Sequence, residues 1–190
     1  MSAMCPGEAS AAKSAASAAM AGSTWLTLHG DLHIWEVSAG LCAPGFFWSE
    51  APGHLAEKYA HFLPFTLHRH AASAEQVAMA RLAAVQAEDC GPCVEIAARG
   101  ALMSGVPRET INAALAGTLE IGVAARALAF GRAIALSLPE TDQLGDAIEA
   151  EWGRAVRIEL TIAAATGRVH PAFKRGLGYA KSCAAQPLQL

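Results

Sequence analysis

Apolar residues recur at helical spacing through most of the second half of the chain. The longest continuous pattern runs from Thr141 to Ala165, and its apolar positions include Leu144, Ile148 and Trp152. These residues fall on one face of a helix, so the pattern predicts a single long helix that ends at Thr166-Gly167. A second helix is predicted after a break near residues 120–122, and it reaches about Leu136.

Start and stop signals define the preceding helices. Ser73 and Gln76 have the spacing of a capping box, and residues 74–89 follow as a nearly all-apolar helix that should be buried. Gly105 is placed to end the next helix, and Pro107 to start another. A turn is predicted at His170-Pro171, before a short terminal helix from residue 172 to 183. No parallel-sheet pattern and no glycine-rich phosphate loop occurs, so the sequence predicts an all-α bundle.

The N-terminal third has a different character. Residues 1–23 are rich in Ala, Ser and Gly and are expected to be a disordered tail, although part of this stretch weakly resembles an export signal. Residues 24–70 hold three tryptophans among turn-forming residues and predict an irregular, aromatic-rich extension with a short helix. A hairpin of two short strands around Gly30-Asp31 is the alternative. The helical domain is predicted to span residues 71–183.

Composition narrows the classes of partner. The net charge is −3 and the isoelectric point is near 6.1, so neither nucleic acid nor an anionic membrane is an expected partner. No apolar run has the roughly 18 residues of a membrane span. The chain has 5 cysteines, which is too few for a disulfide scaffold, and a reducing cytoplasm is the expected location.

Two of the cysteines, Cys90 and Cys93, form a C-x-x-C motif between two helical patterns. If the motif opens a helix, residues three apart share a face and the two sulfur atoms come within bridging distance. The N-terminus of a helix also offers unpaired N–H groups and a positive dipole end, which stabilise a thiolate. The motif therefore predicts a redox-active thiol pair, whereas Cys5, Cys42 and Cys183 are scattered without any such spacing.

Other interpretations of the pair remain open. Free cysteines are often buried as small apolar residues. A zinc site needs four ligands, and the upstream residues His68 and His70 are the only candidates to complete a site with the two cysteines. The tetrapeptide Cys-Gly-Pro-Cys matches thioredoxin, but here it follows a predicted helix and Asp89 rather than a strand and Trp. No cofactor or metal is expected.

The residues around the motif resemble those of a known family. The C-x-x-C pair is followed by Ala101, then Gly105 and Glu109, and by a pair of predicted helices. This arrangement, over roughly residues 75–134, resembles the carboxymuconolactone decarboxylase superfamily and in particular its alkylhydroperoxidase D-like (AhpD-like) redox branch. The resemblance implies a small all-α fold, a homo-oligomer built as a trimer or a multiple of trimers, and a dithiol protein as the reductant. Apolar residues on every face of several helices also favour oligomerisation.

The resemblance also implies a mechanism. Cys93 would attack a hydroperoxide and Cys90 would resolve the product as a disulfide. The family places a histidine and a glutamate of a proton relay at positions that are here Ala97 and Ala78. Glu75, one turn before position 78, is the candidate substitute. The alternative function is a helical oligomer or small-ligand-binding protein that has lost the relay.

Overall fold

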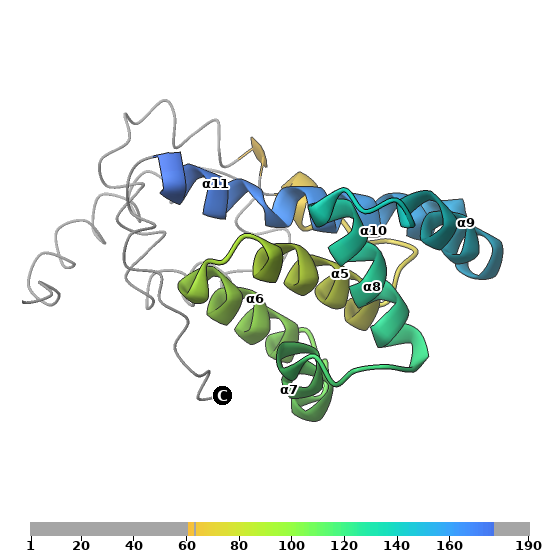
Figure 1. The fold of residues 1–190 in the computed structure, drawn as a ribbon, viewed down its shortest axis with the longest axis horizontal. Coiled ribbons are helices and arrows are strands. Elements are labelled where there is room, and N and C mark those ends of the chain that lie inside the picture. The colour runs from red at the N-terminus through yellow and green to blue at the C-terminus, as the bar shows by residue number, and fades with distance from the viewer. Residues whose placement is uncertain (1–60, 63, 177–190) are drawn as a thin grey trace, which may run out of the picture. The chain divides into compact units, whose positions relative to one another are not determined.

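The computed structural model describes residues 61–62 and 64–176 of the chain (Figure 1). The chain divides into two compact units, residues 1–61 and 62–190, and the helices described below all belong to the second. The predicted Ala/Ser-rich tail and most of the aromatic-rich extension lie outside the described residues. So do Cys5, Cys42 and Cys183.

The described part of the chain is all-α, as predicted, and contains no strand. Its helices are α5 (Ala74–Ala87), α6 (Gly91–Met103), α7 (Arg108–Ala116), α8 (Gly122–Leu136), α9 (Thr141–Trp152), α10 (Arg154–Gly167) and α11 (Val169–Gly176). The expected break before α8 and the end of that helix at Leu136 are both confirmed.

Helix α5 is the centre of the bundle, and it contacts α6, α8 and α10 (Figure 1). Its predicted capping box is present: Gln76 N–H donates to Ser73 Oγ at 3.1 Å, and Ser73 N–H donates to Gln76 Oε1 at 2.7 Å. Buried residues lie on more than one side of the helix, and Met79, Ala80 and Leu82 are fully buried. The apolar character of this segment therefore predicts its central position correctly.

Helices α5 and α8 approach each other at backbone distance. A Cβ atom built on Gly131 of α8 would lie 2.3 Å from the carbonyl oxygen of Ala80. Only a residue without a side chain fits at this crossing, so Gly131 sets the closest approach of the two helices.

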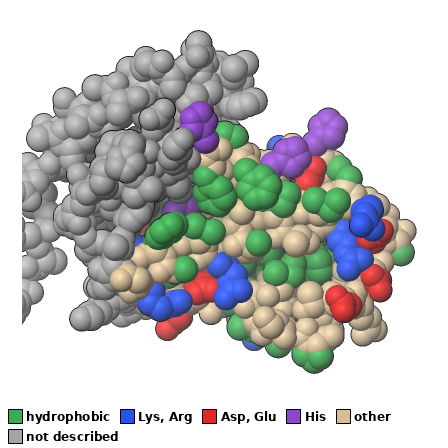
Figure 2. Space-filling model, turned by 90° about the horizontal axis from the view of Figure 1, so that it is seen from above, with side chains coloured by type: hydrophobic (Ala, Val, Ile, Leu, Met, Phe, Trp, Pro, Cys, Tyr) green, Lys and Arg blue, Asp and Glu red, His purple; other side chains and the backbone are tan. Residues whose placement is uncertain are grey.

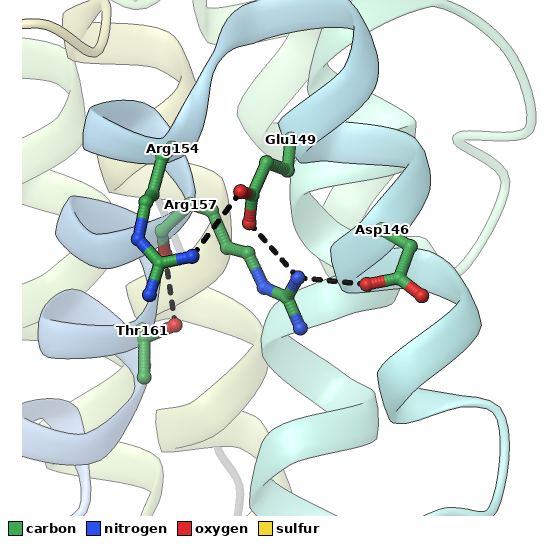
Figure 3. A network of polar contacts seen from close by, with 5 residues as sticks. All are labelled: Asp146, Glu149, Arg154, Arg157 and Thr161. Carbon is green, nitrogen blue, oxygen red and sulfur yellow. Dashed lines mark hydrogen bonds and ion pairs between the residues drawn. The ribbon is translucent and has the colours of Figure 1, made fainter.

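The single long helix predicted from Thr141 to Ala165 is wrong, because the chain breaks at Gly153. This residue has φ 90° and ψ 159°, a conformation that glycine reaches easily and other residues do not. Arg157 of α10 then reaches back to α9, where it donates to Asp146 at 2.8 Å and to Glu149 at 3.0 Å (Figure 3). Gly145 leaves room for this guanidinium, since a Cβ there would lie 2.8 Å from Arg157 Nε.

The predicted turn at His170-Pro171 is also wrong, because both residues lie in the first turn of α11. Proline is tolerated there because the first N–H groups of a helix have no acceptor within the helix.

A buried carboxylate joins α10 to the segment that leads into α5. Glu159 is only 4% exposed. It accepts hydrogen bonds from the backbone N–H groups of His70 at 2.9 Å, Ala71 at 3.0 and 3.1 Å, and Ala72 at 2.8 Å. Burial raises the pKa of Glu159, but these hydrogen bonds outweigh it and hold the pKa below its usual value. The contact fixes the N-terminal end of α5.

Candidate functional site

The C-x-x-C pair lies at the start of α6. Cys90 is the N-cap residue, Cys93 lies in the first turn, and their Cα atoms are 5.2 Å apart. The two sulfur atoms form a disulfide. The spacing therefore predicts the position of the pair correctly, both at a helix start and within bridging distance.

Both sulfur-bearing residues are packed among apolar side chains. Cys90 is 3% exposed and Cys93 is 7% exposed, and they form a cluster with Val85 of α5 and with Val94 and Ala97 of α6. The position where the resembled family has its relay histidine, Ala97, thus lies against the cysteines. The methyl side chain of Ala97 packs against the cysteines but cannot transfer a proton.

The turn between α5 and α6 is held by an ion cluster that the sequence did not reveal. Glu88 Oε1 accepts from Arg168 Nε at 2.5 Å, and Glu88 Oε2 accepts from both terminal nitrogens of Arg175 at 3.0 Å. Arg175 also donates to the Glu88 carbonyl oxygen at 2.9 Å. Burial raises the pKa of Glu88, but the hydrogen bonds from Arg168 and Arg175 outweigh it and hold the pKa low.

The backbone of the same turn is bent sharply. Asp89, which immediately precedes the pair, has φ 50°. This left-handed conformation is uncommon for residues other than glycine, asparagine and aspartate. The turn therefore depends on Asp89 for its shape and on Glu88 for its attachment to α11.

Glu75, the predicted substitute base, is not brought to the cysteines. It lies in the first turn of α5, whereas the cysteines pack on Val85 near the other end of that helix. Ten residues of α-helix span about 15 Å, which is too far for a hydrogen bond or a single bridging water. The family position of the relay glutamate, Ala78, is about one turn closer and still remote.

The two histidines considered as metal ligands also lie at the far end of α5. His70 and His68 precede that helix, and the His68 Nε2 atom lies 3.7 Å from Glu159 Oε1. Within the described part of the chain, no group of three or more His, Cys, Asp and Glu side chains is placed to hold a metal ion. A site that combines these histidines with the cysteines is not formed.

The charge of the surface and the length of the helices concern two kinds of partner, namely highly charged molecules and membranes. Figure 2 shows basic and acidic side chains side by side on the visible face, rather than gathered in a patch of one sign. Among the described helices, none is long and apolar enough to cross a membrane.

Fold and site together define a class: a helical protein with a buried, disulfide-bonded C-x-x-C pair at the start of helix α6. No family model matches the chain, and neither a curated protein nor a solved structure matches it. The resemblance to the alkylhydroperoxidase D-like branch therefore stays a prediction from the residues.

Proposed function

We propose that this chain is a thiol-disulfide redox protein that reduces hydroperoxides through Cys90 and Cys93. The observation that carries the proposal is the disulfide between these residues at the N-terminus of α6. A bridge that closes so short a loop adds little stability, because cross-link stabilisation grows with loop length. A redox role explains the pairing better than a structural one.

The proposed chemistry has three balanced steps. The Cys93 thiolate attacks the terminal oxygen of a hydroperoxide, and with one proton the O–O bond breaks to give a Cys93 sulfenic acid and an alcohol. The Cys90 thiol then displaces water from the sulfenic acid and forms the disulfide. A dithiol protein reduces the disulfide and is itself oxidised to a disulfide.

The surroundings of the pair favour the thiolate in two ways. The start of α6 is the positive end of the helix dipole, which stabilises an anion there. Glu88 would oppose a nearby thiolate if its charge were free. It is instead paired with Arg168 and Arg175, so one carboxylate faces two guanidinium groups. This pairing reduces the repulsion between Glu88 and a thiolate at the motif.

The sulfur atoms must become accessible for turnover. Both cysteines are at least nine-tenths buried, so reaction with a bulky hydroperoxide requires the turn at Glu88–Asp89 to open. We expect small hydroperoxides to react faster than bulky ones for this reason.

The family assignment and the assembly belong to the same proposal. Membership of the alkylhydroperoxidase D-like branch is supported by the motif and its helical setting, and a cytoplasmic location suits a thiol pair that is re-reduced. Exposed apolar side chains support a homo-oligomer, trimeric or a multiple of three. Ile121 is 86% exposed, Ile158 50% and Leu136 44%. A sedimentation experiment that shows a monomer at all concentrations would contradict the oligomer.

The decisive experiment treats the fully reduced protein with one equivalent of an organic hydroperoxide and maps the products by peptide mass spectrometry. We expect a fast and specific Cys90–Cys93 disulfide. The Cys90→Ser variant should stop at a Cys93 sulfenic acid, and the Cys93→Ser variant should lose peroxide turnover. Cys183→Ser is the matched control and should react as the unmodified protein does. Full turnover by Cys93→Ser would refute the proposal.

A non-catalytic helical oligomer or ligand-binding protein is the second candidate. Specific observations favour it: Ala97 lies against the cysteines where a relay base would be needed, and Glu75 lies about 15 Å away along α5. Alkylation of the reduced protein across a pH range separates the two. Thiol pKa values at or above about 8.5, the unperturbed value, would favour the non-catalytic candidate.

A further inference from the structure

The turn that carries the cysteine pair is also a point where α11 is attached. Glu88 and Asp89 connect α5 to Cys90, and the side chain of Glu88 is only 9% exposed. Its carboxylate oxygens accept hydrogen bonds from Arg168, which follows α10, and from Arg175 of α11. Arg175 also donates to the backbone carbonyl oxygen of Glu88. The guanidinium of Arg175 therefore holds both the side chain and the backbone of a residue in the turn that leads to Cys90.

Helix α11 depends on this attachment. It has 8 residues, and helices shorter than about 12 residues are marginal in water without tertiary contacts. Pro171 in its first turn is fully buried, whereas most of the residues after it are exposed. The C-terminal half of α11 thus buries little surface, so the hydrogen bonds of Arg175 contribute much of the free energy that keeps it docked.

Reduction of the disulfide changes the space that the turn must enclose. Cys90 and Cys93 are almost fully buried in the cluster that Val85 forms with them. Two thiols need more room than a disulfide, because sulfur atoms that are not bonded to each other must separate to van der Waals distance. Protein interiors are close-packed, so the surrounding chain has to move to provide this room. The turn between α5 and α6 can move at lower cost than either helix.

We propose that reduction of the Cys90–Cys93 disulfide releases α11 from the turn between α5 and α6, so that the docking of α11 depends on the redox state of the pair. The step is a thiol–disulfide exchange in which a dithiol reductant supplies two electrons and two protons. The S–S bond breaks, two thiols form, and the reductant becomes a disulfide. The turn then moves, and Glu88 no longer keeps its hydrogen bonds to Arg168 and Arg175. Oxidation restores them.

The release of α11 regulates access to the sulfur atoms. Both cysteines are buried while the disulfide is present, and turnover requires the turn to open. In the reduced protein the turn is open when the Cys93 thiol must meet its substrate, and oxidation closes it again. The inference rests on the reversible reduction of the pair that the proposed function requires, but not on a reaction with hydroperoxides.

The test measures hydrogen exchange in the full-length protein by mass spectrometry, first with the pair oxidised and then after reduction with dithiothreitol. We expect the amides of residues 172–176 to exchange at least about tenfold faster in the reduced protein, while the middle of α8 keeps its protection. Equal protection of α11 in the two states would overturn the proposal.

A double variant shows which cysteines are responsible. Cys90→Ser with Cys93→Ser cannot form the disulfide, so its α11 should exchange as fast as in the reduced protein and should not respond to dithiothreitol. A response in this variant would assign the effect to other cysteines and would also overturn the proposal. If the double variant does not fold, the comparison of the oxidised and reduced unmodified protein decides.

A second measurement uses thermodynamic linkage. If the disulfide favours the docking of α11, docking must favour the disulfide by the same factor. Arg175→Gln weakens docking, so its equilibrium constant for reduction of the pair by glutathione should rise about fivefold or more. The loss of a positive charge near the thiols would act in the opposite direction, so the sign of the change separates the two effects.

Arg154→Gln is the matched control for Arg175→Gln. Arg154 lies on α10, its side chain is 78% exposed, and it pairs with Glu149 on the surface, so this variant should leave the equilibrium constant unchanged. An Arg175→Gln protein that is equally hard or harder to reduce would contradict the linkage. Peroxide turnover with unchanged protection of α11 would refute this inference alone, and release of α11 without peroxide turnover would refute the proposed function alone.

Discussion

The carboxylate of Glu159 offers the most direct test of how this bundle is held together. Replacing it by glutamine keeps the size and shape of the side chain but removes the charge and one acceptor oxygen. Its two oxygens now accept from the backbone N–H groups of His70, Ala71 and Ala72 at 2.8 to 3.1 Å. In Glu159→Gln an amide NH₂ group would face at least one of these donors.

The cost follows from the number of hydrogen bonds and from burial. A buried N–H group left without an acceptor costs about 1–3 kcal/mol, and the remaining bonds to the neutral oxygen are weaker than those to a carboxylate. We therefore expect Glu159→Gln to lower the free energy of unfolding by about 2–4 kcal/mol. For a chain of this size that corresponds to a fall in Tm of roughly 5–15 °C.

Urea unfolding followed by circular dichroism at 222 nm measures this difference. The matched control is Glu151→Gln, a carboxylate whose side chain is 48% exposed and which pairs with Arg126 on the surface. Exposed pairs contribute at most about 1 kcal/mol, so the control should change little. If Glu159→Gln loses less than the control, the buried carboxylate does not stabilise the start of α5 and the reasoning fails.

The same carboxylate predicts a dependence of stability on pH. Because the pKa of Glu159 is lower in the folded protein than its ordinary value of 4.5, the folded state favours the ionised form. This contribution is fully present above the unfolded pKa and is lost as the pH falls through the folded pKa. Below about pH 4.5 the unmodified protein should therefore lose its advantage over Glu159→Gln.

Two further outcomes are expected. Gly131→Ala forces a methyl group against the backbone of Ala80, so it should lower the free energy of unfolding in urea by about 1–3 kcal/mol or more. Gly100→Ala is the control, because nothing lies within 4 Å of a Cβ built there. It should raise the free energy of unfolding by about 0.5–1 kcal/mol. Glu88→Gln should speed hydrogen exchange in α11 and leave α8 unchanged, and equal protection in α11 would show that the ion cluster does not hold it.

The elements that depend on local signals could be predicted from the sequence. The capping box at Ser73, the cysteine pair at a helix start and the glycine stop after α6 each depend on residues within a few positions of one another. The prediction of one continuous helix through Gly153 was wrong for a local reason as well. A glycine inside an apolar repeat is compatible with a helix, and only its observed φ of 90° shows that the chain turns there.

The polar contacts that position the site depend on pairings far apart in the chain. Glu88 meets Arg168 and Arg175 across 80 and 87 residues, and no spacing rule connects them. A weaker signal was present for Arg81, which interrupts a segment predicted to be buried and donates to the backbone carbonyl oxygen of Thr66. Glu159 likewise lies on the buried face of α10, three residues after Val156. A charged residue within an apolar face is a better indicator of a special contact than the periodicity that surrounds it.

These contacts also explain why the cysteine pair has a defined position. Both ends of α5 are attached to the same part of the chain, the N-terminal end through Glu159 of α10 and the C-terminal end through Arg168 and Arg175. Each attachment depends on a carboxylate whose pKa is lower in the folded protein than its ordinary value. Protonation at low pH should therefore loosen both ends of α5 while the apolar contacts in its middle persist. Hydrogen exchange at pH 3 and pH 7 would show this as lost protection at residues 70–74 and 88–93 with retained protection near Met79. Because the turn that carries the disulfide lies at one of these ends, the same loosening should make Cys90 and Cys93 easier to reduce.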